Sequence, residues 1–187
     1  MGMWLFLFTE MLLFGGMFIL YAVYRFKHPV EFHTSAKDLD TTIGAVNTLI
    51  LLTSSLTMAL SIAALQKGKK RLSLVLQVLT ILMGAAFLGN KSLEWGAKFH
   101  HGMYPNSAYL LTKSSGEILF YGLYFVMTGI HGLHVLIGIG VLLFMVSFTM
   151  RGSIDSTNFV KLENSGLYWH FVDIVWVYLF PLFYLIT

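Results

Sequence analysis

The chain has 187 residues, of which 57% are hydrophobic and only 11% are Asp, Glu, Lys or Arg. A soluble globular domain carries roughly 25% charged residues, so this composition cannot supply a polar surface. It excludes a soluble domain, a disordered chain and a nucleic-acid-binding protein. The formal net charge of +3 implies no anionic partner other than lipid head groups. The absence of cysteine excludes disulfides, iron–sulfur centres and cysteine catalysis.

Five apolar stretches are each long enough to cross the hydrocarbon core, which takes about 20 residues. They lack period-two alternation, and this favours helices over the strands of a membrane barrel. We therefore predict an all-α, polytopic membrane bundle of five transmembrane helices that forms a single domain over residues 1–187. The predicted spans are approximately 3–24, 43–65, 72–95, 117–150 and 166–186.

The first span contains one charged residue, Glu10. At 1.5 Å per residue it lies about 10 to 15 Å into the helix, where a carboxylate is desolvated. An ionisable group at membrane depth is costly, and is a functional candidate by default. Two interpretations stay open for Glu10. It is either a proton-linked group or a polar contact between helices that contributes about 1 kcal/mol.

Two pairs of residues are predicted to interact locally because of their spacing. Lys91 and Glu94, near the end of the third span, are three residues apart and therefore lie on one side of a helix. Pairing would lower the cost of burying both charges. Ser114 and Glu117 have the spacing of a capping box, which predicts that the fourth helix begins there.

The fourth and fifth spans each carry a pair of ionisable residues three apart, His131 with His134 and His170 with Asp173. Helix bundles can build metal or haem sites from such side chains. A haem with two histidine ligands would need one from each helix, because two histidines on one helix cannot bind both faces. Interhelical hydrogen bonding is the preferred interpretation, and a bound cofactor is the alternative.

Other residues on these two spans predict packing rather than chemistry. Gly122, Gly129 and Gly140 share one face of the fourth span, and small residues allow helices to approach closely. Trp169 and Trp176 share one face of the fifth span together with the acid between them. The sequence contains no phosphate-binding loop, no Ser–His–Asp arrangement and no H-E-x-x-H motif. No catalytic residue and no metal ligand set is therefore predicted.

The orientation depends on the basic residues between spans. Lys and Arg are equally numerous on alternate sides, but four of them lie within residues 67–71. Because cytoplasmic connections are enriched in basic residues, this dense turn is predicted to be cytoplasmic, as is the N-terminus. Five spans then place the C-terminus outside.

The spans also contain strings typical of one family. The fifth reads GLYWHFVDIVWVYLF over 166–180, and the fourth reads GIHGLHVLIG over 129–138. Both resemble signature segments of subunit III of haem–copper oxidases of the cytochrome c oxidase type. The first span has the F-x-x-x-E string that ends at Glu10. The third span matches the family pattern at Gly84, Phe87, Lys91, Glu94 and Trp95.

The resemblance implies an accessory subunit without a catalytic site or a bound cofactor, in a hetero-oligomeric complex of a respiratory chain. Haem and copper would reside in the partner subunits I and II. Subunit III would pack on the catalytic subunit, support proton uptake and complex stability, and contact membrane lipids. The family's long form has seven helices, and this chain resembles the last five, so the lipid contacts of the first two are not carried over.

The resemblance also bears on individual residues and on location. It implies a bacterial inner membrane, with the N-terminus cytoplasmic. It favours hydrogen bonding over metal binding for His131, His134, His170 and Asp173, and it suggests His134 as the partner of Glu10. Five-helix relatives also occur beside quinol oxidases and nitric oxide reductases, which the motifs do not separate. A cytochrome b-like electron carrier with a bis-histidine haem is the alternative from another class.

Overall fold

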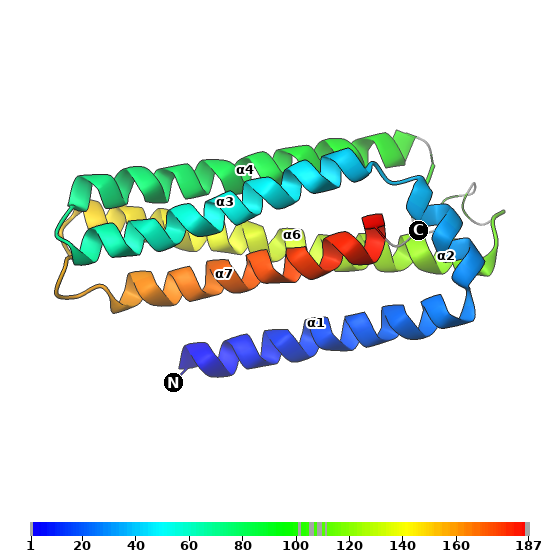
Figure 1. The fold of residues 1–187 in the computed structure, drawn as a ribbon, viewed down its shortest axis with the longest axis horizontal. Helices are drawn as coiled ribbons and strands as arrows, with labels where there is room; N and C mark the ends of the chain where they lie inside the picture. The colour runs from blue at the N-terminus through cyan, green and yellow to red at the C-terminus, as the bar shows by residue number, and fades with distance from the viewer. Residues whose placement is uncertain (1, 101, 105–106, 108–109, 111, 186–187) are drawn as a thin grey trace. The chain divides into compact units, whose positions relative to one another are not determined.

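The computed structural model describes residues 2–100, 102–104, 107, 110 and 112–185. The regular secondary structure of these residues is entirely helical, with no strand among them, which confirms the predicted all-α class (Figure 1). The last residue of the predicted fifth span, Ile186, lies outside them. The helices are α1 (Gly2–Lys27), α2 (Pro29–Lys37), α3 (Thr41–Gln66), α4 (Lys70–His100), α6 (Ser115–Met150) and α7 (Val160–Phe180), followed by the π-helical turn η1 (Pro181–Leu185).

Five helical segments are long and apolar enough to cross a membrane: α1, α3, α4, α6, and α7 continued by η1. The chain is an integral membrane protein, as predicted. Several spans extend beyond the predicted limits; α4 continues to His100 and α7 already begins at Val160. The reason is that a helix continues into polar sequence at the membrane surface, where composition no longer marks it. The short polar helix α2 was not predicted.

Local sequence signals set several helix ends. Gly68 and Gly152 follow α3 and α6 with φ angles of 71° and 78°, a left-handed conformation that favours glycine. Beyond Gly68, the Lys69 amide donates to the Ala64 carbonyl at 2.9 Å, which closes the helix end. At the start of α6, the Ser114 hydroxyl accepts a hydrogen bond from the amide three residues later at 3.4 Å, as the predicted cap requires.

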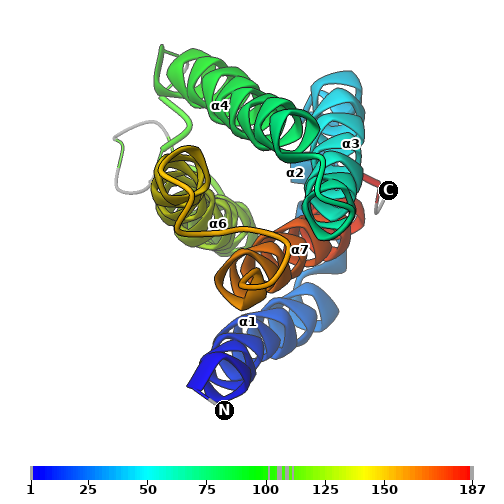
Figure 2. The same ribbon diagram turned by 90° about the vertical axis from the view of Figure 1, so that its left-hand side faces the viewer.

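The described chain divides into two compact units, and α3, α4, α6 and α7 each contribute residues to both. Unit 1 comprises residues 1–45, 90–131 and 175–187, and unit 2 comprises residues 46–89 and 132–174. Figure 2 looks onto the end of unit 2 at which the α3–α4 and α6–α7 connections lie. The single membrane domain expected from the sequence stays a prediction.

The core of unit 1 is a series of aromatic rings. The ring of Tyr21 from α1 packs edge-on against Phe32 of α2 at 5.4 Å and against Phe183 of η1 at 5.0 Å. Phe120 of α6 contacts Phe32 at 5.4 Å and Phe183 at 5.7 Å in the same manner. Edge-to-face ring pairs contribute beyond the area they bury. The series therefore fastens α2 and η1 to the long helices.

The core of unit 2 is centred on Trp169 of α7, which is 0% exposed. Its indole nitrogen donates to the Ser54 hydroxyl on α3 at 3.0 Å. A Cβ atom added at Gly84 of α4 would lie 2.6 Å from the indole ring, and one added at Gly138 of α6 would lie 2.9 Å from it. Four helical segments thus meet at one indole, and two of them approach it through glycine.

The glycine face predicted for the fourth span is largely wrong. A Cβ atom at Gly122 or Gly140 would meet nothing within 4 Å, and only Gly129 lies close to another side chain, at 3.1 Å from Trp95. The close approach is instead made by Gly138, which the predicted face did not include. Spacing along a helix identifies which residues share a face, but not which face the neighbouring helix covers.

Candidate functional site

A buried ion pair lies at the centre of unit 1. The Lys91 Nζ atom is 3.0 Å from Glu94 Oε2, one helical turn away on α4. Lys91 is 5% exposed and Glu94 is 7% exposed, so both charges are removed from solvent and lipid. A buried charge is tolerated only where partners replace its hydration. The spacing predicted this pair, and the rest of its surroundings come from other helices.

Two tyrosines complete the hydrogen bonding of this pair. Lys91 Nζ donates to the hydroxyl of Tyr124 on α6 at 2.9 Å and to that of Tyr184 on η1 at 2.7 Å. Both hydroxyls in turn donate to Glu94 Oε1 at 2.6 Å. The three ammonium donors of Lys91 and both oxygens of Glu94 are therefore used. We call these four residues the Lys91 cluster; it joins α4, α6 and η1.

Aromatic faces surround the ammonium group as well. Lys91 Nζ lies 4.7 Å from the ring centroid of Tyr124 and 5.2 Å from that of Trp176 on α7. Trp176 is fully buried, and its indole lies against the His131 ring at 5.2 Å with an interplanar angle of 32°. Cation–π contacts of this kind are strongest where water is absent. Lys91, Glu94, His131 and Trp176, all predicted site residues, are thus brought together in unit 1.

A second cation of α4 lies beside the Lys91 cluster. Lys98 is 6% exposed, and its Nζ lies 3.5 Å from the Asp38 carbonyl oxygen, just beyond α2. The same Nζ is 5.7 Å from the rings of Tyr121 and Tyr124. The Tyr121 hydroxyl donates to the Asp38 carboxylate at 3.2 Å. The short helix α2 is thereby attached to α4 and α6 at one place.

The remaining predicted polar residues of the last two helices lie in unit 2. His170 Nδ1 shares a hydrogen bond of 2.6 Å with the Ser55 hydroxyl on α3. Asp173 is 2% exposed on the same helix. His134 is buried, and its backbone carbonyl accepts a hydrogen bond of 3.0 Å from Tyr168. These contacts join α7 to α3 and α6.

Glu10 belongs to unit 1, where it is half-buried on α1. It borders a stripe of buried residues at seven-residue intervals, formed by Leu7, Phe14 and Tyr21. His134 belongs to unit 2. The pairing of Glu10 with His134 therefore stays a prediction.

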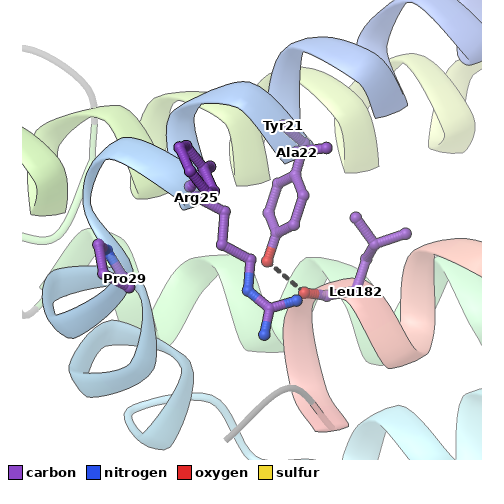
Figure 3. Close-up of a pocket in the computed structure, with 6 residues that line it drawn as sticks. Tyr21, Ala22, Arg25, Pro29 and Leu182 are labelled. Atoms are coloured by element: carbon purple, nitrogen blue, oxygen red, sulfur yellow. Dashed lines mark hydrogen bonds between the residues drawn. The ribbon is translucent and has the colours of Figure 1, made fainter.

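An open groove of about 530 Å³ lies between the end of α1 and η1 in unit 1. Figure 3 shows Arg25 extending from α1 toward the carbonyl of Leu182, which accepts a hydrogen bond from the Tyr21 hydroxyl. Ala22, Phe26 and Pro29 supply the apolar remainder of its lining. This hydrogen bond joins α1 to η1, as does the contact between the rings of Tyr21 and Phe183.

The sequence did not indicate four residues of this region: Tyr124, Tyr184, Lys98 and Asp38. One signal could have indicated the two tyrosines: a tyrosine within an apolar span needs a hydrogen-bond partner for its hydroxyl. That signal does not say which partner, since Tyr124 and Tyr184 are 30 and 90 residues from Glu94. Among the described residues, no three His, Asp or Glu side chains are grouped closely enough to hold a metal ion.

Together these features define a class: a polytopic helical membrane protein in which Lys91 and Glu94 form a buried ion pair within the bundle. The family model of cytochrome c oxidase subunit III matches residues 1–187. The cytochrome c oxidase subunit 3 of Thermostichus vulcanus is 32% identical over 188 residues, which cover 100% of this chain and 87% of that protein. The chain belongs to the cytochrome c oxidase subunit III family, as its motifs indicated.

Relatives named for different electron donors have similar sequence identity to this chain. The cytochrome bo(3) ubiquinol oxidase subunit 3 of Pseudomonas aeruginosa is 32% identical over 185 residues, which cover 98% of this chain and 83% of that protein. The cytochrome c oxidase subunit 3 of Synechocystis is 34% identical over 187 residues, covering 99% of this chain and 74% of that protein. Identity alone does not separate the two kinds of oxidase.

Proposed function

We propose that the chain is a non-catalytic subunit of a haem–copper terminal oxidase, which packs on the catalytic subunit and supports proton uptake and complex stability. The observation that carries this proposal is the match of the subunit III family over residues 1–187. The relatives named above are oxidase subunits 3, of cytochrome c and of ubiquinol oxidases. In this role the chain binds neither haem nor copper, which belong to the partner subunits I and II.

The Lys91 cluster supports a structural role for the chain's own charges. Lys91 and Glu94 direct their polar atoms to each other and to two tyrosine hydroxyls, at 2.6 to 3.0 Å. Groups that are engaged in this way hold helices in register. The chain would then offer its partner a fixed surface in the membrane rather than a reactive site.

Copurification tests the proposal directly. The chain is expressed in its native host with an affinity tag, and the membranes are solubilised in a mild detergent. We expect haem-containing subunits I and II to elute with it, so that the eluate shows a Soret band. The tagged chain expressed alone should show no Soret band. A tagged chain that elutes without any haem-containing subunit would overturn the proposal.

The same preparations distinguish the other readings. A Soret band from the chain alone that disappears in His131→Ala or His170→Ala would instead establish a cytochrome b-like carrier. If the complex forms as expected, oxygen consumption with reduced cytochrome c or with a quinol identifies the electron donor. Nitric oxide consumption in place of oxygen consumption would assign the complex to the nitric oxide reductases.

The proposed location is a bacterial inner membrane in contact with lipid, with the N-terminus cytoplasmic and the C-terminus outside. Because the chain has no cysteine, single cysteines can report the orientation without background. In intact cells, an impermeant maleimide should label Lys37→Cys and Lys113→Cys but not Lys69→Cys or Asp155→Cys. The reverse pattern would show that the orientation is wrong.

We further propose that Glu10 is a proton-linked group. Its support is a half-buried carboxyl on a membrane-spanning helix, since an ionisable group at that depth marks function by default. Glu10→Gln should leave assembly intact and shorten the period over which the purified complex sustains turnover. Thr9→Ala, one residue away, serves as the control. Loss of assembly in Glu10→Gln alone would show that Glu10 is structural instead.

A further inference from the structure

The helix that completes the Lys91 cluster changes its geometry at a proline. The α-helix α7 ends at Phe180, and η1 continues it from Pro181 as a π-helical turn. A π-turn closes its hydrogen bonds between residues i and i+5, where an α-helix joins i and i+4, so the turn accommodates one extra residue. By the end of η1, each side chain therefore lies about one residue position behind its place in an unbroken α-helix.

The proline at the first position of η1 gives the π-turn a physical cause. Pro181 has no amide hydrogen to donate to the Val177 carbonyl, and in α geometry its ring would clash with that carbonyl. Pro29 is a contrasting case, because it lies in the first turn of α2. The amide groups of a first turn have no partner within the helix, so a proline there leaves the helix unchanged.

The hydroxyl of Tyr184 depends on this register. It bonds with Lys91 Nζ at 2.7 Å and donates to Glu94 Oε1 at 2.6 Å. In an unbroken α-helix, the preceding residue, Phe183, would take the place of Tyr184 beside the ion pair. Phenylalanine has no hydroxyl group, so the Lys91 cluster would lose one of its two phenolic partners.

The contacts of η1 within unit 1 are specific to the same register. A Cβ atom added at Gly44 of α3 would lie 2.9 Å from the Tyr184 ring and 2.7 Å from the Phe180 ring. The Leu182 carbonyl accepts a hydrogen bond from the Tyr21 hydroxyl (Figure 3). A helix one residue out of register would bring other groups to α1 and α3. The side chains around η1 therefore fit only one of the two registers.

We propose that Pro181 sets the helical register of η1, and thereby places the Tyr184 hydroxyl on the buried ion pair of Lys91 and Glu94. In this device η1 is a strap that closes over the Lys91 cluster, and the proline selects which aromatic residue completes the cluster. All the contacts that carry the proposal lie within unit 1. It is independent of the proposed oxidase role.

Exchanging the two aromatic residues of η1 tests the register. The double change Phe183→Tyr with Tyr184→Phe moves the hydroxyl by one position, and it is made in chains with and without Pro181→Ala. Thermal unfolding in detergent is followed by circular dichroism. With Pro181 present, the exchange should lower the thermal midpoint by about 2 to 4 °C, because Glu94 loses one of its two hydroxyl donors.

The opposite sign is expected in the Pro181→Ala background. There the exchange should raise the midpoint by a similar amount, because the α-helical register brings the hydroxyl at position 183 to the ion pair. A merely destabilising effect of the exchange would lower the midpoint in both backgrounds. The reversal of sign therefore reports the register and not the general stability of unit 1.

Pro29→Ala is the matched control, since it removes a proline of unit 1 from a position that sets no register. In that background the exchange should lower the midpoint as it does in the unaltered chain. An exchange that fails to raise the midpoint in the Pro181→Ala background would overturn the proposal. Failure of both Pro181→Ala chains to fold would overturn it as well, because the proposal requires that η1 can adopt the α-helical register.

Discussion

Units 1 and 2 hold their helices together with different chemistry. In unit 1, an ammonium and a carboxylate at 3.0 Å bond with two tyrosine hydroxyls. In unit 2, neutral groups join the helices: the Trp169 indole donates to the Ser54 hydroxyl, and the hydroxyls of Thr57 and Thr80 form a hydrogen bond of 2.8 Å. Lipid tails are as apolar as leucine, so neither unit can rely on the hydrophobic effect between helices. Polar bonds and close packing replace it in both.

This difference predicts how the stability of each unit should respond to substitution. A buried ion pair is satisfied only as a whole, because removing one partner leaves the other charge without compensation. Neutral hydrogen bonds and van der Waals contacts are lost one at a time, and their loss leaves no buried charge without a partner. Unit 1 should therefore respond to substitution abruptly, and unit 2 in graded steps.

The largest effect is expected at Lys91. Lys91→Met leaves the Glu94 carboxylate buried without a cation and should lower the free energy of unfolding by about 3 to 5 kcal/mol. The measurement is reversible unfolding of the purified chain in detergent, followed by circular dichroism.

The double variant Lys91→Met with Glu94→Gln provides the control for that experiment. Because it removes both charges, it should be more stable than Lys91→Met alone. If the single variant is as stable as the unaltered chain, the ion pair contributes nothing to unit 1, and the contrast between the units disappears.

The next largest effect is steric and belongs to unit 2. Gly84→Ala places a methyl group where a Cβ atom would lie 2.6 Å from Trp169, and should cost about 1 to 3 kcal/mol. Gly89→Ala, on the same helix, meets nothing within 4 Å and should be neutral or favourable by up to about 1 kcal/mol. Gly138→Ala and Gly140→Ala on α6 form a second such pair, in which the loss of stability is expected at Gly138. Equal effects at Gly84 and Gly89 would contradict the packing described for Trp169.

A smaller effect is expected at Ser54. Ser54→Ala removes the acceptor of the Trp169 indole N–H and should cost about 1 kcal/mol in the same unfolding assay. Ser61→Ala is the matched control, since among the described residues that buried hydroxyl donates only within its own helix, to the carbonyl of Met58 at 2.8 Å and its sulfur at 3.7 Å. We expect it to cost less than about 0.5 kcal/mol. A larger loss at Ser61 than at Ser54 would show that the interhelical bond is not what stabilises unit 2.

The smallest effect concerns the loop between α6 and α7. The hydroxyl and amide of Thr157 and the amide of Asn158 lower the pKa of Asp155. A carboxyl with a lowered pKa stabilises the fold above its unfolded value, roughly pH 3.9, and loses this contribution as the pH falls through the folded pKa. The thermal midpoint of the chain should exceed that of Asp155→Asn slightly at pH 7, and the difference should shrink as the pH falls below about 4. A difference that grows toward low pH would contradict the assignment.

The sequence determined the helical class and the approximate positions of the five spans. The physical reason is that a bilayer offers no hydrogen bonds, so each apolar stretch must satisfy its backbone internally as a helix. It also determined contacts between near neighbours, such as Lys91 with Glu94 and Ser114 with the start of α6. Fixed helical geometry brings such residues together whatever the other helices do.

Only the tertiary structure decided which helices complete each group. The hydroxyls of Tyr124 and Tyr184 reach Glu94 from distant parts of the chain, and Gly138 rather than Gly140 meets Trp169. A helix in a bundle presents one side to its neighbours and another to lipid, and an apolar sequence hardly distinguishes them. The charges, the approximate span positions and the motifs of this chain could therefore be predicted from its sequence, while the hydrogen-bond partners on other helices required the tertiary structure.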